Sequence, residues 1–207
     1  EDREERGVTL FVKICGVTTE EAADAAVAAG ADAIGFVFHA PSPRNLLPGR
    51  AAALARNLPP GVLCVAVTLH PEQAVIDRVL ESMMPDAWQS DAADFDVLHI
   101  PAVIERWPVL RQHGSAPKGP RRVVFESPAS GSGWRADWTA ASAMARTAEL
   151  ILGGGLDATN VGRAIAAVRP FGVDVSSGVE RSPGVKDARR IREFIVAARI
   201  TGQAVPA

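Results

Sequence analysis

Short apolar runs rich in β-branched residues alternate with alanine-rich amphipathic stretches along almost the whole chain. This alternation is typical of a parallel sheet whose strands are joined by crossover helices. The expected strands cover residues 10–15, 32–38, 62–69, 86–89, 107–111, 122–126, 149–153 and 172–176. The expected helices cover residues 18–29, 48–58, 71–83, 137–147, 161–168 and 187–199. Thr18 with Glu21 three residues later is a capping-box pattern, which predicts the start of the first helix.

Eight parallel strands in about 200 residues favour a small closed (β/α)8 TIM barrel of the α/β class. A doubly wound open sheet is the alternative, but it usually has a glycine-rich loop after its first strand. Here the first strand ends in Cys15-Gly16, and the glycine clusters come late. Between the fifth and sixth strands lies only the segment QHGSAPKGPRR, which is rich in Gly and Pro. We therefore expect a bare loop there in place of a helix.

Length and composition narrow the class of protein. A chain of 207 residues suits one domain, expected over residues 10–200 with a solvated leader at 1–9 and a tail at 201–207. Hydrophobic residues make up 47%, which excludes a disordered chain, and the net charge of −2 argues against nucleic-acid or membrane-surface binding. No signal peptide or membrane span is expected, so a cytoplasmic location is predicted. The two cysteines lie far apart in the sequence and the four histidines are scattered, so we expect neither a disulfide scaffold nor a metal site.

The mouth of a TIM barrel lies at the carboxyl ends of its strands, so those positions are the candidates for chemistry. At the end of the first strand, Lys13 and Cys15 face the same side. The lysine favours ionisation of the thiol, which could then act as a base or nucleophile; the alternative is a small buried apolar residue. Arg44 follows the second strand in a proline-stiffened loop and could anchor an anionic substrate, or be an ordinary surface arginine.

Glu126 ends the sixth strand after the apolar run Val123-Val124-Phe125. Partial desolvation there would raise the pKa of its carboxyl toward the range of a general acid. A helix cap or a solvated loop residue is the alternative.

Small residues follow the last three strands. Backbone N–H groups in such turns form anion nests, and barrels often bind phosphate after strands seven and eight. The candidates are Gly131, Ser132, Gly133, Gly153, Gly154, Gly155, Ser176, Ser177 and Gly178.

Two long motifs resemble the phosphoribosylanthranilate isomerase family. VKICGVTTEEAADAAVAAGADAIGFVF, with SPR just after it, is similar to the family's start, and LGGGLDATNVGRAIAAVRPFGVDVSSGVERSPGVKD is similar to its end. GSGWRADW between them is similar to the family's glycine loop followed by Asp-Trp. The resemblance implies an Amadori rearrangement of N-(5-phosphoribosyl)anthranilate in tryptophan biosynthesis, without cofactor or metal.

The resemblance also implies roles for single residues. Cys15 would be the base, and the position of the family's acid is occupied by Glu126. Arg44 and Asp174 would contact the substrate, although Asp174 could instead be the inward partner of Lys13. The phosphate would be bound by Gly154, Gly155, Ser176, Ser177 and Gly178.

The chain departs from the family pattern along one arc of the barrel. Glu126 replaces an Asp, Ser90-Asp91 replaces the His-containing sequence after Gln89, and Trp134 stands where the family often has Lys. A lineage with a rebuilt arc and a paralogue with an altered substrate both explain this pattern.

Two other classes of function stay open at this point. One is a non-catalytic barrel that binds phosphate; retention of Cys15, Arg44 and a carboxyl at position 126 argues against it. The other is a different phosphosugar enzyme, such as a lyase that uses Lys13 or a metal-dependent epimerase, for which metal ligands are lacking. The expected partner is a small phosphorylated substrate, and the expected assembly is a monomer or a homodimer.

Overall fold

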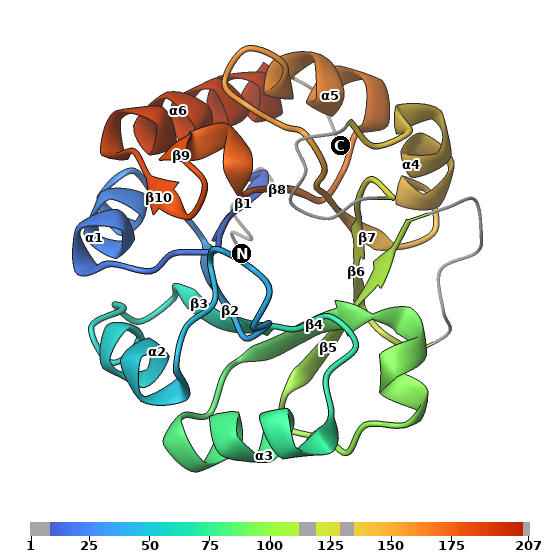
Figure 1. The fold of residues 1–207 in the computed structure, drawn as a ribbon. Helices are drawn as coiled ribbons and strands as arrows, with labels where there is room; N and C mark the ends of the chain where they lie inside the picture. The colour runs from blue at the N-terminus through green and yellow to red at the C-terminus, as the bar shows by residue number, and fades with distance from the viewer. Residues whose placement is uncertain (1–8, 112–118, 129–134, 205–207) are drawn as a thin grey trace, which may run out of the picture.

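A computed structural model of the chain describes residues 9–111, 119–128 and 135–204. Its eight strands form a closed parallel barrel in which each strand pairs with the next and β8 pairs with β1 (Figure 1). The expected TIM barrel is therefore confirmed. The strands are β1 (Phe11–Cys15), β2 (Ala33–Val37), β3 (Leu63–Val67), β4 (Ala87–Asp91), β5 (Glu105–Leu110), β6 (Arg122–Phe125), β7 (Glu149–Leu152) and β8 (Gly172–Val175).

Helices surround the barrel, as Figure 1 shows. They are α1 (Glu20–Ala28), α2 (Pro48–Ala55), α3 (Gln73–Ser82), α4 (Trp138–Ala145), α5 (Val161–Val168) and α6 (Ala188–Ala204), with the 3-10 turns η1 (Ala92–Asp96) and η2 (Ser177–Val179). The described residues between β5 and β6, which exclude 112–118, contain no helix. This agrees with the short, Gly- and Pro-rich link in the sequence.

The core has two layers because successive side chains of a strand point to opposite faces. Residues such as Ile14, Ile34 and Trp88 point outward and pack beneath the helices. The inward positions form a separate cluster inside the barrel, made of Phe11, Ala33, Val65, Ala87, Trp107, Val109, Val124 and Ile151. Continuing that inward set toward the carboxyl ends of the strands leads directly to the side chains at the mouth.

Three local features differ from the sequence expectations. The first helix is capped by Thr19, whose hydroxyl accepts a hydrogen bond from the Ala22 N–H at 3.2 Å, while the Thr18 hydroxyl donates to the Gly184 carbonyl. Helix α6 continues past residue 199 to Ala204, and its Gly202 lies close to Leu10 at the start of the barrel. A short hairpin, β9 (Glu180–Ser182) and β10 (Val185–Lys186), follows β8 and was not predicted.

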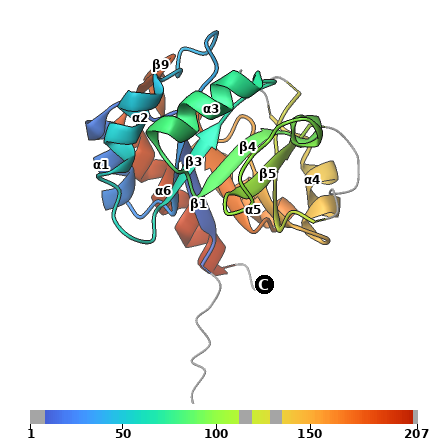
Figure 2. The same cartoon turned by 90° about the horizontal axis from the view of Figure 1, so that it is seen from below.

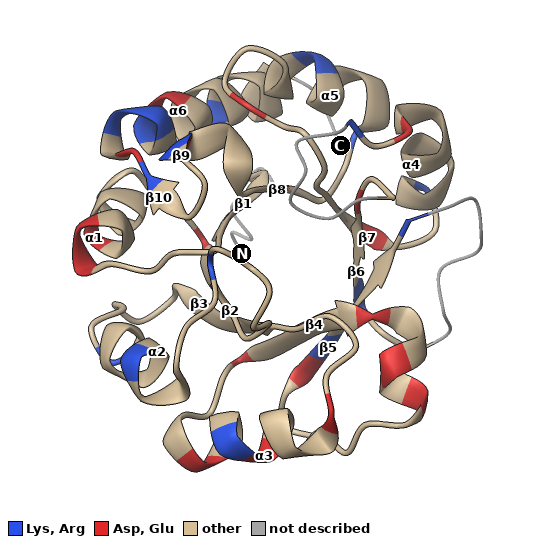
Figure 3. Cartoon of the chain, viewed as in Figure 1, with Lys and Arg blue, Asp and Glu red and all other residues tan. Residues whose placement is uncertain are grey.

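Figure 2 shows that β9 lies at the end of the barrel opposite the start of β1 and the end of α6. Acidic and basic residues are intermixed over the surrounding helices in Figure 3. In the part of the chain that the structure describes, no helix has the length and apolar character needed to span a bilayer.

Candidate active site

A cavity of about 610 Å³ opens at the carboxyl ends of the strands. Six of the side chains singled out in the sequence line it: Cys15, Arg44, Glu126, Asp174, Ser176 and Ser177. They come from the ends of three strands, β1, β6 and β8, and from the loop after β2, which only barrel closure brings together. The apolar part of the cavity wall includes Val37, Val67 and Val109.

Cys15 is the last residue of β1 and points into the barrel. Gly35 on β2 leaves room for the thiol, since a Cβ at that position would lie 2.9 Å from the sulfur. Burial raises the pKa of the Cys15 thiol, and the nearby Lys13 charge only partly opposes this because Asp174 acts in the other direction. The expected lowering of the thiol pKa is therefore wrong, because desolvation outweighs the lysine.

Lys13 lies on the same inward face, two residues below Cys15. Its ammonium donates to Asp174 Oδ1 at 2.9 Å, and both side chains are buried. Burial lowers the pKa of Lys13, but the Asp174 charge and the hydrogen bonds of the ammonium outweigh it and raise the pKa overall. Asp174 is thus the partner of Lys13 and at the same time part of the cavity wall.

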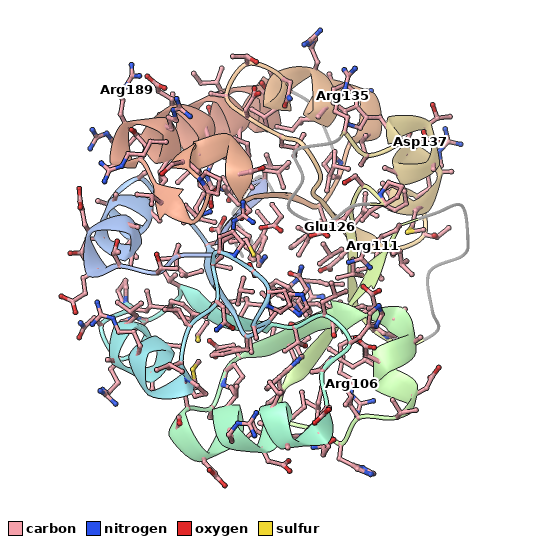
Figure 4. The ribbon with its side chains drawn as sticks, in the orientation of Figure 1. Arg106, Arg111, Glu126, Arg135, Asp137 and Arg189 are labelled. Atoms are coloured by element: carbon pink, nitrogen blue, oxygen red, sulfur yellow. The ribbon has the colours of Figure 1, made fainter. Side chains whose placement is uncertain are left out.

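Glu126 is the first residue after β6, and its N–H donates to the Leu110 carbonyl at 3.0 Å. Its side chain lies over Gly153, where a Cβ would be 3.2 Å from the glutamate Cγ. Glycine at 153 therefore makes room for the longer carboxylic acid. Arg111, just after β5, brings Nη2 to 3.8 Å from Glu126 Oε2, and Figure 4 shows the two side chains together inside the ring of strands.

Arg44 lines the cavity at the mouth and is paired there with a buried acid. Its guanidinium donates two hydrogen bonds to Glu180, at 2.7 and 2.8 Å, and its carbon chain lies against Gly16, which has a positive φ of 72°. Lys186 Nζ donates to the same carboxylate at 2.8 Å and to the Ser176 carbonyl at 2.9 Å. Two cations thus share one buried acid at the rim of the cavity.

The turns after β6, β7 and β8 lie against one another. Gly154 and Gly155 adopt positive φ, and a Cβ on Gly154 would lie 2.7 Å from the Ser127 nitrogen. A Cβ on Gly178 would lie 1.9 Å from the Leu156 carbonyl oxygen. Only glycine permits these approaches, which hold the turn after β7 against those after β6 and β8. Ser176 and Ser177 line the cavity, whereas Gly154, Gly155 and Gly178 lie behind its wall. The candidates Gly131, Ser132 and Gly133 lie outside the described residues.

Sequence reasoning missed three side chains that line this cavity and a fourth, Lys186, that pairs with one of them. Arg111 and Gln89 are inward positions of predicted strands, so period-two alternation could have found them. Glu180 and Lys186 belong to a hairpin that no local pattern announced. Among the described residues that line the cavity, Gln89 has a buried side-chain oxygen, Oε1, without a hydrogen-bond partner.

The arrangement suits proton transfer on a small anionic molecule. A thiol and a carboxylic acid face one cavity from different strands, and the hydroxyl residues Ser176 and Ser177 line the same cavity. In residues 9–111, 119–128 and 135–204, no group of three or more His, Cys, Asp or Glu residues could hold a metal ion.

Comparison with known proteins gives consistent results. The family model for N-(5'-phosphoribosyl)anthranilate (PRA) isomerase matches residues 12–197. An N-(5'-phosphoribosyl)anthranilate isomerase from Pelobacter propionicus is 40% identical over 202 residues, which cover 93% of this chain and 97% of that protein.

Solved structures agree with the sequence comparison. The phosphoribosyl anthranilate isomerase of Thermus thermophilus aligns with a TM-score of 0.79 at 28% identity, over 91% of this chain and 98% of that one. A second phosphoribosyl anthranilate isomerase, in complex with reduced 1-(o-carboxyphenylamino)-1-deoxyribulose 5-phosphate, aligns with a TM-score of 0.75 at 31% identity, over 91% and 98% of the two chains.

Proposed function

Because this chain belongs to the N-(5'-phosphoribosyl)anthranilate isomerase family, we propose that Cys15 and Glu126 are the base and the acid of its reaction. The protein is a PRA isomerase of tryptophan biosynthesis: it converts N-(5'-phosphoribosyl)anthranilate to 1-(2-carboxyphenylamino)-1-deoxyribulose 5-phosphate. The observation that supports the two roles is that both side chains line one cavity of about 610 Å³ from opposite parts of the barrel.

The reaction needs two proton transfers. Glu126 gives its proton to the ring oxygen of the ribose, so that the C1–O bond breaks and the nitrogen lone pair forms the C1=N double bond of an iminium ion. The Cys15 thiolate then removes the proton from C2. The electrons of that C–H bond form the C1=C2 bond while the C1=N π pair returns to nitrogen, which gives a neutral enolamine with a hydroxyl on C2. Transfer of the enol proton and protonation at C1 give the ketone of the product.

The two ends of the substrate would be held by different parts of the rim. Support for phosphate binding comes from two observations: Gly178 lets the turn after β8 pack against Leu156 in the turn after β7, and Ser176 and Ser177 line the cavity. Arg44 would face the anthranilate end, oriented by its two hydrogen bonds to Glu180. Reaction at Lys13 has no support, because its ammonium is buried in the pair with Asp174.

The raised pKa of Cys15 affects how much of the enzyme is in the reactive protonation state. The active form holds a thiolate and a protonated carboxylic acid, and the thiol ionises at a higher pH than a carboxylic acid. The profile of kcat/KM against pH then has an acidic break that follows Glu126 and an alkaline break that follows Cys15. Between the breaks, kcat/KM is proportional to the small fraction of enzyme in the active form.

Loss of anthranilate fluorescence with freshly made PRA measures the reaction directly. Cys15→Ser and Glu126→Gln should each lower kcat/KM by about 10²–10⁴-fold while leaving the fold intact. Cys64→Ala, which removes the other thiol of the chain, is the control and should remain active. Near-full activity of Glu126→Gln would mean that the acid lies elsewhere, and Asp174 would be tested next.

The proposal of a cytoplasmic enzyme rests on family membership.

A further inference from the structure

A row of charged side chains crosses the rim of the cavity and ends at Glu126. His70 Nε2 lies 3.2 Å from Asp91 Oδ2, Asp91 accepts a hydrogen bond from Arg111, and Arg111 Nη2 lies 3.8 Å from Glu126 Oε2. The row joins the loop after β3 to the ends of β4, β5 and β6. Three of its four members, Asp91, Arg111 and Glu126, have less than a fifth of their side chains exposed.

Strand register brings Arg111 to this position. Val109 pairs with Val124 and Leu110 with Phe125, so Arg111 and Glu126 are the next residues on neighbouring strands. Arg111 points inward because it follows the inward residues Trp107 and Val109 at intervals of two. Asp91 shares the inward face of β4 with Ala87 and Gln89, which places it beside the guanidinium.

The far end of the row is held in place by a second acid. Asp94 in η1 accepts from the His70 N–H at 3.2 Å and lies 2.9 Å from His70 Nδ1. These contacts hold His70 at a positive φ of 45°, although most of its side chain is exposed. Asp91 therefore lies between the His70 imidazole and the Arg111 guanidinium, and Asp94 fixes the His70 end of the row.

We propose that Arg111 positions the Glu126 carboxyl for proton transfer, and that Asp91 neutralises the Arg111 charge so that this carboxyl can hold a proton. The proposal rests on Glu126 being the acid. Arg111 and Asp91 are positioning residues, since neither is required to touch the reacting atoms. A guanidinium suits this task because its planar donors can contact two carboxylates in fixed directions.

The reason lies in opposing electrostatic effects. An arginine beside a carboxyl stabilises the ionised form, which cannot donate a proton. Asp91 supplies a compensating negative charge on the other side of the guanidinium. Within the described part of the chain, the other charged or titratable side chains around the cavity are Cys15 on β1 with the Lys13–Asp174 pair below it, Glu180 with Arg44 and Lys186, His39 and Arg181 at the rim, and His70 with Asp94. The hydrogen bond to Asp94 raises the pKa of His70, and its wide exposure screens it from the cavity.

The test compares the two single variants with their double variant. In Asp91→Asn the loss of the negative charge beside Arg111 should move the acidic break of the kcat/KM profile to lower pH by half a unit or more. The plateau of kcat/KM should fall by the corresponding factor, because a smaller fraction of the enzyme then holds both the thiolate and a protonated Glu126. In Arg111→Gln the break should move to higher pH, while the rate constant of the correctly protonated form falls about tenfold. The double variant should return the break toward its original pH without restoring that rate constant.

Two matched controls separate these effects from a general loss of charge. Asp96→Asn changes an exposed acid of η1, and Arg106→Gln changes an exposed arginine of β5 that Figure 4 shows away from Glu126. Neither should move the break. Ionisations of the substrate are common to all variants and cancel in the comparison. If Arg111→Gln does not fold, Arg111→Lys is used: it should keep the break and lose the rate constant, because it keeps the charge without the planar fork.

The outcomes distinguish this inference from the proposed function. If Glu126→Gln remains active, Glu126 is not the acid and both are wrong. If Glu126→Gln is inactive but the breaks of Asp91→Asn and Arg111→Gln stay in place, or move in the same direction, only the positioning inference is overturned. Full activity of the folded Arg111→Lys variant would also overturn it.

Discussion

The ammonium of Lys13 lies 2.9 Å from Asp174 Oδ1 inside the barrel, on the same inward face as the Cys15 thiol and below it. The lysine lowers the pKa of the thiol, the aspartate raises it, and burial raises it most. The ion pair therefore limits how much the buried lysine can help to form the thiolate. The same pair therefore contributes both to the stability of the barrel interior and to the pKa of Cys15, the proposed base.

Lys13→Met should separate these two roles. Removing the ammonium leaves a buried carboxylate without its partner, so the free energy of unfolding should fall by about 3–5 kcal/mol. The thiol also loses its nearest cation, and the alkaline break should move to higher pH with lower activity. Denaturant unfolding and the pH profile measure the two effects. Lys13→Met combined with Asp174→Leu should recover stability but not activity; recovery of both would contradict a role for Lys13 in ionising Cys15.

The raised pKa of Cys15 predicts an unusually alkaline second break. Since the thiolate is the base, its fraction grows with pH until the thiol is fully ionised, and kcat/KM should fall only above the ordinary thiol range, near pH 8.5. The rate of alkylation of Cys15 by iodoacetamide, measured in a Cys64→Ala background, reports the same ionisation. An alkylation midpoint below about pH 8 would show that burial does not dominate.

Glu126→Asp tests whether the site is adapted to the longer acid. The shorter side chain withdraws the carboxyl by about 1 Å, and such a displacement should lower kcat/KM by tenfold to about 100-fold. Gly153→Ala is the companion variant, because its Cβ would lie 3.2 Å from the glutamate Cγ and displace that side chain from the opposite direction. Undiminished activity of Glu126→Asp would mean that the length of the acid is not important.

Glu180 should make the stability of the rim depend on acid pH. Burial raises the pKa of its carboxyl, but the hydrogen bonds and charges of Arg44 and Lys186 outweigh burial and lower it. A lowered pKa in the folded state means that the stabilisation is complete above the ordinary carboxyl range, near pH 4, and is lost as the pH falls through the lowered value. Tm should therefore decrease more steeply below about pH 4 in the wild type than in Glu180→Gln. Parallel curves would contradict this.

Gly178→Ala should disrupt phosphate binding. Its Cβ would lie 1.9 Å from the Leu156 carbonyl oxygen, so the turn after β8 must move away from the turn after β7. Inorganic phosphate should raise the Tm of the wild type and have much less effect on this variant. Gly49→Ala is the control: a Cβ there has no heavy atom within 4 Å in helix α2, so stability should rise slightly and phosphate protection should be retained.

Local pattern alone was sufficient to predict much of this protein. Strand and helix order follow from hydrophobic periodicity, which depends only on neighbouring residues, and eight strands in a short chain favour a closed barrel. The inward placement of Lys13 and Cys15 follows from the same alternation. The family motifs led to the isomerase, and the family and its relatives confirm that function.

Tertiary structure decided the interactions between residues far apart in the chain. Arg44 and Glu180 are 136 positions apart, and only closure of the barrel and folding of the β9–β10 hairpin bring them together. The same closure brings Asp91 and Arg111 to Glu126. It also buries Cys15, so the solvent lost around the thiol raises its pKa against the effect of the neighbouring lysine. Desolvation and long-range ion pairing depend on three-dimensional distance, which sequence spacing does not contain.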